Sequence, residues 1–270
     1  MIIADRFEGF IVDLDGVVWV GDRVVPGAAE AIGELRRRGK RVLFVTNDPR
    51  SSRQEYAARL TEHGIPSARD DVLTSGAATA EVAARATAGA ARAFVVGSQA
   101  LKREVQAAGL TVVDGESGRG AEVVVVGGHD GFDYHELRVA ASAARGGATL
   151  YATGRDATFP MPDGPWPATG ALVAAIETAS GARAIAVGKP EPHLFEVARE
   201  RLELPAERIA VVGDTPGSDI AGGRAAGMAA ILVLTGNARR EDLSTLDEPP
   251  VAVLDDLGGL FSDRDEPGLR

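Results

Sequence analysis

The chain has 270 residues, of which 45% are hydrophobic and 25% are charged, and it contains no cysteine. This composition supports a full hydrophobic core and excludes disorder, disulfide frameworks and cysteine-based zinc sites. The formal net charge of −10 opposes binding to phosphate backbones, so we expect no nucleic-acid partner.

The start of the chain and its hydrophobic pattern predict a cytoplasmic location and no membrane partner. Asp5, Arg6 and Glu8 precede the first apolar run, which is unlike the start of a signal peptide. No apolar stretch approaches the roughly 18 residues that a membrane-spanning helix requires.

Short aliphatic runs alternate with helix-like stretches along the whole chain. Strand-like runs occupy residues 10–12, 42–45, 94–96, 123–126, 185–187, 209–212 and 231–234. Unbroken aliphatic runs suit strands that are covered by helices on both faces. Helical spacing is found between them, for example in residues 28–38, 54–63 and 194–202, and the alanine-rich residues 77–93 predict a surface helix. This alternation predicts an α/β fold with parallel strands.

Four of the strand-like runs end in residues that can bind phosphate or metal. These ends are Asp13-Leu14-Asp15, Thr46-Asn47, Gly188-Lys189-Pro190 and Gly213-Asp214. In open α/β sheets, ligands bind at the edge where the carboxyl ends of the strands meet. If all four strands belong to one sheet, we expect these residues to converge in one pocket.

Taken singly, these residues have ordinary structural explanations. An aspartate or a threonine–asparagine pair after a strand is typical of turns and helix caps. Capping does not explain two carboxylates at i and i+2, a third on another strand and a lysine on a fourth. Close carboxylates repel one another and are costly to bury without a cation. Because the available ligands are oxygens, the pattern favours Mg²⁺.

In chain order, these residues resemble the four motifs of the haloacid dehalogenase superfamily. The motifs are residues 13–17, Thr46-Asn47, Lys189 and residues 213–219. Branch-like features resemble the NagD-like, 4-nitrophenylphosphatase subfamily, and they lie at residues 15–19, 74–76, 152–156 and 167–170. The resemblance covers residues 10–236. It implies a Rossmann-like, doubly wound parallel-sheet core formed by residues 1–76 and 185–270, with an inserted α/β cap domain at residues 77–184.

The resemblance also implies a reaction, which is the hydrolysis of a small phosphorylated metabolite through an aspartyl phosphate. Asp13 would attack phosphorus, and Asp15 would protonate the leaving alcohol and then activate water. Thr46, Asn47 and Lys189 would bind the phosphoryl group.

The same resemblance implies a Mg²⁺ site. The carboxylates of Asp13 and Asp214 and the backbone carbonyl of Asp15 would bind the ion. Asp219 would hold water molecules bound to the metal.

Substrate specificity is where the sequence departs from its relatives. Asp48 replaces a second asparagine after Thr46-Asn47, and Thr158-Phe159 stands where pyridoxal phosphate phosphatases carry Trp-His. This departure weakens a pyridoxal phosphate assignment and leaves sugar, polyol, glycolate and nitrophenyl phosphates as candidates. Arg50 and Asp156 are candidate contacts to the leaving group, with a surface or structural role as the alternative.

Two other functions and one assembly state stay open. A phosphomutase would use the same core residues. A non-catalytic sensor of a phosphate ligand would be expected to lose one of Asp13, Asp15, Lys189 or Asp214, and all four are present. Dimers formed through the cap occur in relatives, so a homodimer is an alternative to a monomer.

Overall fold

The structure is a computed structural model that describes residues 2–87, 90–161, 163–241 and 249–262. The chain forms two compact units. The first unit comprises Met1–Thr46, Gln54–Leu73 and Lys189–Arg270, and the second comprises Asn47–Arg53 and Thr74–Gly188. A parallel sheet flanked by helices forms the centre of each unit, which confirms the predicted α/β class.

The larger sheet has six strands in the order β15-β14-β13-β1-β4-β5. Their bounds are β1 Gly9–Asp13, β4 Arg41–Thr46, β5 Val72–Thr74, β13 Ile209–Gly213, β14 Ala229–Val233 and β15 Ala252–Leu254. On one side of β1 the chain continues through β4 to β5, and on the other side it returns through β13 to β15. The strand order therefore reverses between β1 and β13. Ligand sites of doubly wound sheets lie at the carboxyl ends of the strands beside such a reversal.

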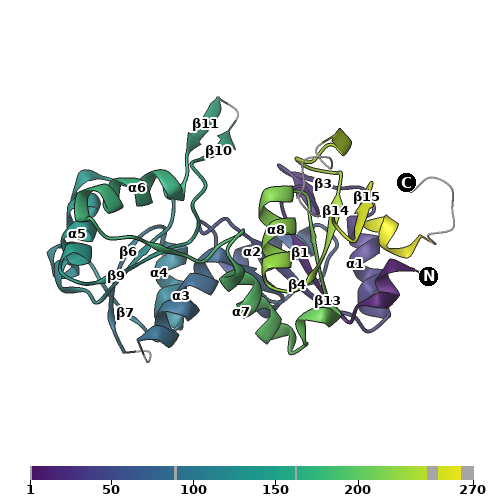
Figure 1. Cartoon of the computed structure of the whole chain (residues 1–270), viewed down its shortest axis with the longest axis horizontal. Coiled ribbons are helices and arrows are strands. Elements are labelled where there is room, and N and C mark those ends of the chain that lie inside the picture. The colour runs from purple at the N-terminus through teal and green to yellow at the C-terminus, as the bar shows by residue number, and fades with distance from the viewer. Residues whose placement is uncertain (1, 88–89, 162, 242–248, 263–270) are drawn as a thin grey trace. The chain divides into compact units, whose positions relative to one another are not determined.

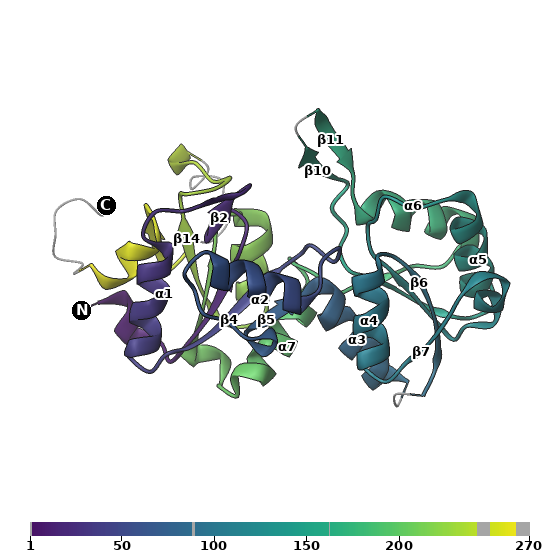
Figure 2. The same cartoon turned by 180° about the vertical axis from the view of Figure 1, so that it is seen from behind.

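Helices cover both faces of the six-stranded sheet. Phe10 and Val12 of β1 pack in one core cluster with residues of α1 (Ala28–Arg37) and α2 (Arg53–Glu62). The opposite face is covered by α7 (Pro192–Leu202) and α8 (Ala221–Ala225), where Gly223 lies directly against Val211. Figure 1 shows α7 and α8 in front of this sheet. Figure 2, which shows the opposite side, has α1 and α2 in front of it. The doubly wound core predicted from the sequence is confirmed.

The second unit contains a five-stranded parallel sheet in the order β12-β9-β8-β6-β7. Its strands are β6 Arg92–Val96, β7 Thr111–Val113, β8 Val123–Val126, β9 Thr149–Ala152 and β12 Ile185–Ala186. One face packs against α5 (Tyr134–Arg145) and α6 (Thr169–Ser180), and the other against α3 (Ser75–Ala86) and α4 (Gln99–Ala107). An antiparallel hairpin of β10 (Thr158–Met161) and β11 (Gly164–Pro167) precedes α6.

The condition that all four polar-ended strands share one sheet does not hold for one of them. The run at residues 185–187 contains β12, which pairs with β9 in the five-stranded sheet, with Ile185 opposite Tyr151. An aliphatic run indicates a buried strand but carries no information about which sheet it joins. The second compact unit comprises Asn47–Arg53 and Thr74–Gly188, and the cap bounds of residues 77–184 stay a prediction.

The alanine-rich helix has a more deeply buried face than a surface helix would suggest, although Arg85 and Ala86 at its end are exposed. In α3, Ala78, Ala80 and Ala83 are each at most 1% exposed. Helix propensity predicts that alanine forms a helix but not which face the helix presents. Small side chains allow close packing, and here they lie against α4 and the strands beneath.

Among the described residues, no helix combines the length and the apolar character needed to cross a membrane.

Candidate active site

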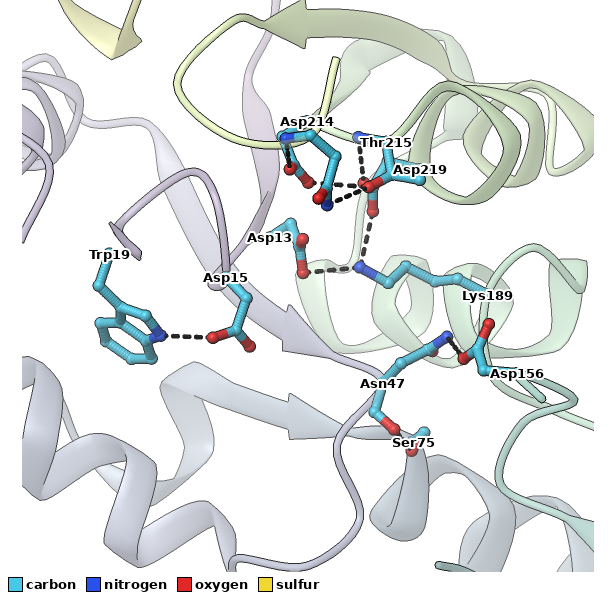
Figure 3. A network of polar contacts seen from close by, with 11 residues as sticks. Asp13, Asp15, Trp19, Asn47, Ser75, Asp156, Lys189, Asp214, Thr215 and Asp219 are labelled. Atoms are coloured by element: carbon cyan, nitrogen blue, oxygen red, sulfur yellow. Dashed lines mark hydrogen bonds and ion pairs between the residues drawn. The ribbon is translucent and has the colours of Figure 1, made fainter. Parts of the chain in front are cut away.

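Asp13 lies at the carboxyl end of the central strand and is held by a buried lysine. It is the last residue of β1, and its strand neighbour Val45 directly precedes Thr46 at the end of β4. Lys189 Nζ donates a hydrogen bond to Asp13 Oδ1 and another to Asp219 Oδ1, both at 2.6 Å (Figure 3). All three side chains are at most 9% exposed. The structure thus brings together predicted residues that lie far apart in sequence.

Asp214 follows β13 and is held between two glycines. Its Oδ2 accepts from the backbone N–H of Asn237 at 2.6 Å, and its Oδ1 accepts from Thr215 Oγ1 at 3.1 Å. A Cβ atom on Gly16 would lie 2.2 Å from Asp214 Oδ2, and one on Gly236 would lie 2.0 Å from it. Any side chain at either position would therefore displace the carboxylate.

Asp219 lies in a single turn of π-helix at Pro216–Ile220. Its Oδ1 accepts from Lys189, and its Oδ2 accepts from the backbone N–H of Thr215 at 3.1 Å. Both of its carboxylate oxygens are therefore engaged by neighbouring donors.

The carboxylates form a group that fits a hard cation. Asp13, Asp214 and Asp219 each offer one oxygen, these oxygens lie within 4.8 Å of one another, and all three residues are buried. Lys189 alone does not balance the charge of three nearby carboxylates. An all-oxygen donor set suits Mg²⁺, so the residues fit the predicted ion. The Asp15 side chain is not part of this group, and the role of its backbone carbonyl stays a prediction.

Burial and mutual repulsion shift the ionisation of this cluster. Burial raises the pKa of Asp13 well above its ordinary value and Asp219 adds to the rise, while Lys189 opposes it. Burial also raises the pKa of Asp214, against the hydrogen bond from Asn237. Burial by itself would lower the pKa of Lys189, but the attraction of the Asp13 and Asp219 carboxylates is larger and raises that pKa. These directions describe a site that needs more positive charge than the lysine supplies.

Asp15 lies two residues beyond Asp13 and is exposed. Its Oδ1 accepts a hydrogen bond from the indole N–H of Trp19 at 2.9 Å (Figure 3). Sequence reasoning did not predict this contact, and it missed the contacts of Thr215 and Asn237 with Asp214. The i,i+4 spacing of Asp15 and Trp19 was the only hint of their hydrogen bond in the sequence. It predicts the contact only when the conformation of the turn between them is known.

The remaining predicted residues lie in the second unit. Asn47 Nδ2 donates to Asp156 Oδ2 at 3.4 Å, and the Asn47 carbonyl accepts from Ser75 Oγ at 2.7 Å. Arg50 donates to both carboxylate oxygens of Asp48 at 2.9 Å, and its guanidinium carbon lies 4.5 Å from the centre of the Phe159 ring. The negative charge of Asp48 is therefore paired with Arg50.

The fold and the order of these residues agree with comparisons to known families. A sequence profile of the haloacid dehalogenase-like hydrolases matches residues 10–111, and a second profile, described as HAD-hydrolase-like, matches residues 186–260. The chain is also 39% identical to human chronophin over 252 residues, which cover 89% of this chain and 85% of chronophin. The chain belongs to the haloacid dehalogenase-like hydrolases, as predicted from its motifs.

Solved structures point to phosphatases within this family. The p-nitrophenyl phosphatase from Archaeoglobus fulgidus has a TM-score of 0.88 and 33% identity, with 94% of this chain and 98% of that chain covered. The glycerol phosphate phosphatase from Mycobacterium tuberculosis, in complex with magnesium, has a TM-score of 0.90 and 36% identity, with 97% and 79% covered. The predicted subfamily, hydrolase class and Mg²⁺ dependence agree with these relatives.

Proposed function

We propose that this chain is a Mg²⁺-dependent phosphatase that hydrolyses small phosphomonoesters through an aspartyl phosphate. One observation carries the proposal. Asp13 is the last residue of the central strand, at the reversal of strand order, and its carboxylate accepts a hydrogen bond from Lys189 and lies close to those of Asp214 and Asp219. The similarity to phosphatases over nearly the whole chain supports it.

In the first half of the reaction, a carboxylate oxygen of Asp13 attacks phosphorus as the ester P–O bond breaks. Asp15 gives its proton to the departing alkoxide. In the second half, Asp15 takes a proton from water as the water oxygen attacks the phosphorus of the aspartyl phosphate. Inorganic phosphate leaves, and the Asp13 carboxylate is restored. Thr46, Asn47 and Lys189 hold the phosphoryl oxygens, with Lys189 acting as a point charge.

The carboxylates of Asp13 and Asp214 and the backbone carbonyl of Asp15 are the proposed Mg²⁺ ligands. When bound, the ion supplies positive charge that stabilises the transferring phosphoryl group. Asp219 is proposed to hold Lys189 through their hydrogen bond and to hold metal-bound water rather than the ion itself.

The second unit is proposed to be a cap that restricts the substrate to small esters. In the sequence, its parallel sheet and its described helices α3 to α6 come after Thr46 and before Lys189, as expected for an inserted domain. Arg50 and Asp156 are its proposed contacts to the leaving group of a sugar, polyol, glycolate or nitrophenyl phosphate. A cap that closes over the phosphate would exclude water from the first half of the reaction.

We place the enzyme in the cytoplasm, with a small phosphorylated metabolite as its ligand and no nucleic-acid or membrane partner. The formal net charge of −10 supports the absence of a nucleic-acid partner. A homodimer is the alternative to a monomer, and light scattering on the purified protein decides between them.

Phosphate release from a panel of esters tests the function. We expect turnover with Mg²⁺, none with a chelator, and none for Asp13→Asn, which keeps the size of the side chain and removes the nucleophile. A wild-type protein that releases no phosphate from any ester would overturn hydrolysis. Conversion of a sugar phosphate to its isomer without phosphate release would identify a mutase.

A further inference from the structure

Trp19 makes a specific polar contact with the proposed acid–base residue. Its Nε1–H donates to Asp15 Oδ1 at 2.9 Å, and in Figure 3 the second oxygen of Asp15 turns away from the indole. Within the described part of the chain, Asp15 Oδ2 receives no hydrogen bond. The exposed carboxylate is thus held by one oxygen and open at the other.

The indole itself is fixed on several sides. Trp19 is fully buried, and its ring stacks on Tyr56 with 6.4 Å between ring centres and 4° between ring planes. The guanidinium carbon of Arg59 lies 4.2 Å from the centre of the Trp19 ring, and the centre of the His63 ring lies 5.9 Å from that of Trp19. Because these contacts already fix the Trp19 side chain, its N–H binds Asp15 without a further loss of side-chain entropy.

The backbone also couples the two residues. Trp19 begins β2 (Trp19–Val20), which pairs with β3 (Arg23–Val24) in a short antiparallel ribbon. The N–H of Gly16 donates to the Trp19 carbonyl at 2.6 Å, and the N–H of Trp19 donates to the Leu14 carbonyl at 3.2 Å. Backbone hydrogen bonds therefore join the turn that carries Asp15 to the residue that binds its carboxylate.

We infer that Trp19 is a positioning residue for proton transfer, which assigns Oδ2 of Asp15 as the oxygen that carries the proton. The inference rests on the proposed function. An indole N–H can only donate, so Oδ1 acts as an acceptor in both halves of the reaction. Oδ2–H gives its proton to the leaving alkoxide as the ester P–O bond breaks. Oδ2 then takes a proton from the attacking water.

This role differs from core packing in its dependence on the leaving group. An alkoxide needs a proton to leave, whereas nitrophenolate leaves with little need of one. The ratio kcat/KM covers the steps up to phosphoryl transfer to Asp13 and not the later hydrolysis of the aspartyl phosphate. A defect in proton donation therefore lowers kcat/KM for an alkyl ester selectively, while a loss of folded enzyme lowers it equally for every ester.

The test compares wild type with Trp19→Phe, which keeps an aromatic ring and removes the N–H. For glycerol phosphate we expect kcat/KM to fall about 10- to 100-fold, a part of the roughly 10²- to 10⁴-fold that a general acid provides. For 4-nitrophenyl phosphate we expect a fall of less than about threefold, since the general-acid contribution is not needed. An equal fall for both esters would overturn the positioning role.

A second variant keeps the shape of the ring. The chain has two tryptophans, so in a Trp166→Phe background the sulfur analogue β-(3-benzothienyl)alanine replaces Trp19 alone. The matched control is the same background with ordinary tryptophan. The same selective loss is expected with an unchanged Tm, and equal rates in the pair would refute the inference. If wild type and the control release phosphate from neither ester, the proposed function fails and the inference fails with it.

Discussion

Lys189 and Asp219 form a buried ion pair, and the same lysine nitrogen also donates to Asp13. The lysine and both aspartates belong to the first unit, where they come from segments that lie far apart in the sequence. Since the lysine is 4% exposed, it serves as an internal counter-ion for the two carboxylates. This arrangement makes the stability of the core depend on residues of the proposed active site.

Lys189→Met is therefore expected to destabilise the protein in the presence of chelator. Two buried carboxylates lose their lysine partner, and breaking a buried ion pair by removing one member costs about 3–5 kcal/mol. Urea unfolding measures the change. The control is Lys102→Met, which removes an exposed pair with Asp114 and should cost at most about 1 kcal/mol. Equal losses in the two variants would contradict the prediction.

Gly16→Ala should abolish phosphate release and the stabilisation by Mg²⁺. Gly16 has φ of +84°, and an added Cβ would lie 2.2 Å from Asp214 Oδ2, so the carboxylate must move. The matched control is Gly21→Ala, where φ is +59° and no atom lies within 4 Å of the added Cβ. The control carries only the backbone strain of about 1–2 kcal/mol and should keep activity. The measurement is phosphate release by both variants, and an active Gly16→Ala enzyme would contradict the prediction.

The stabilisation by Mg²⁺ should grow with pH across the weakly acidic range. Burial raises the pKa of Asp13 and Asp214 in the metal-free protein, so their contribution to stability is full below the unfolded pKa. That contribution is lost as pH rises through the folded pKa. Mg²⁺ binds the ionised carboxylates and relieves their repulsion, so the gain in Tm increases as they ionise.

Thermal unfolding at several pH values, with Mg²⁺ and with chelator, measures this gain. The comparison is Asp214→Asn, because this change removes a proposed metal ligand that is also a carboxyl group with a raised pKa. Its Tm should respond less to Mg²⁺ at every pH. A wild-type gain that stays constant from acidic to neutral pH would argue against the prediction.

Arg50→Gln should alter the choice of ester rather than the chemistry. Arg50 is paired with Asp48 and packs on Phe159, so its loss leaves Asp48 without this guanidinium partner. We expect KM for glycerol phosphate to rise about tenfold, or ~1.4 kcal/mol of binding, with kcat within about twofold. Steady-state kinetics measures the split. Arg85→Gln, a surface change in the same unit, should leave both constants unaltered. A fall in kcat with unchanged KM would assign Arg50 a different role.

Much of this protein follows from its sequence alone. The alternation of aliphatic runs with helical stretches determines the α/β class, because the strand and helix periods are local properties of the chain. Asp13 ends a strand, and Asp15 and Asp214 lie one or two residues beyond a strand, so their place at the carboxyl edge of a sheet was predictable. Their chemistry, with no cysteine in the chain, selected an oxygen-bound ion such as Mg²⁺.

Other features were decided only by the tertiary structure. The aliphatic run before Lys189 joins the second sheet, which depends on its pairing with Tyr151 rather than on its composition. The hydrogen bond from Trp19 to Asp15 requires the turn at Gly16, and the Asp214 carboxylate fits only because Gly16 and Gly236 approach it from distant segments. Sequence patterns report which local conformation a segment favours. Which distant groups then meet depends on packing, where a single added carbon atom can displace a carboxylate from its site.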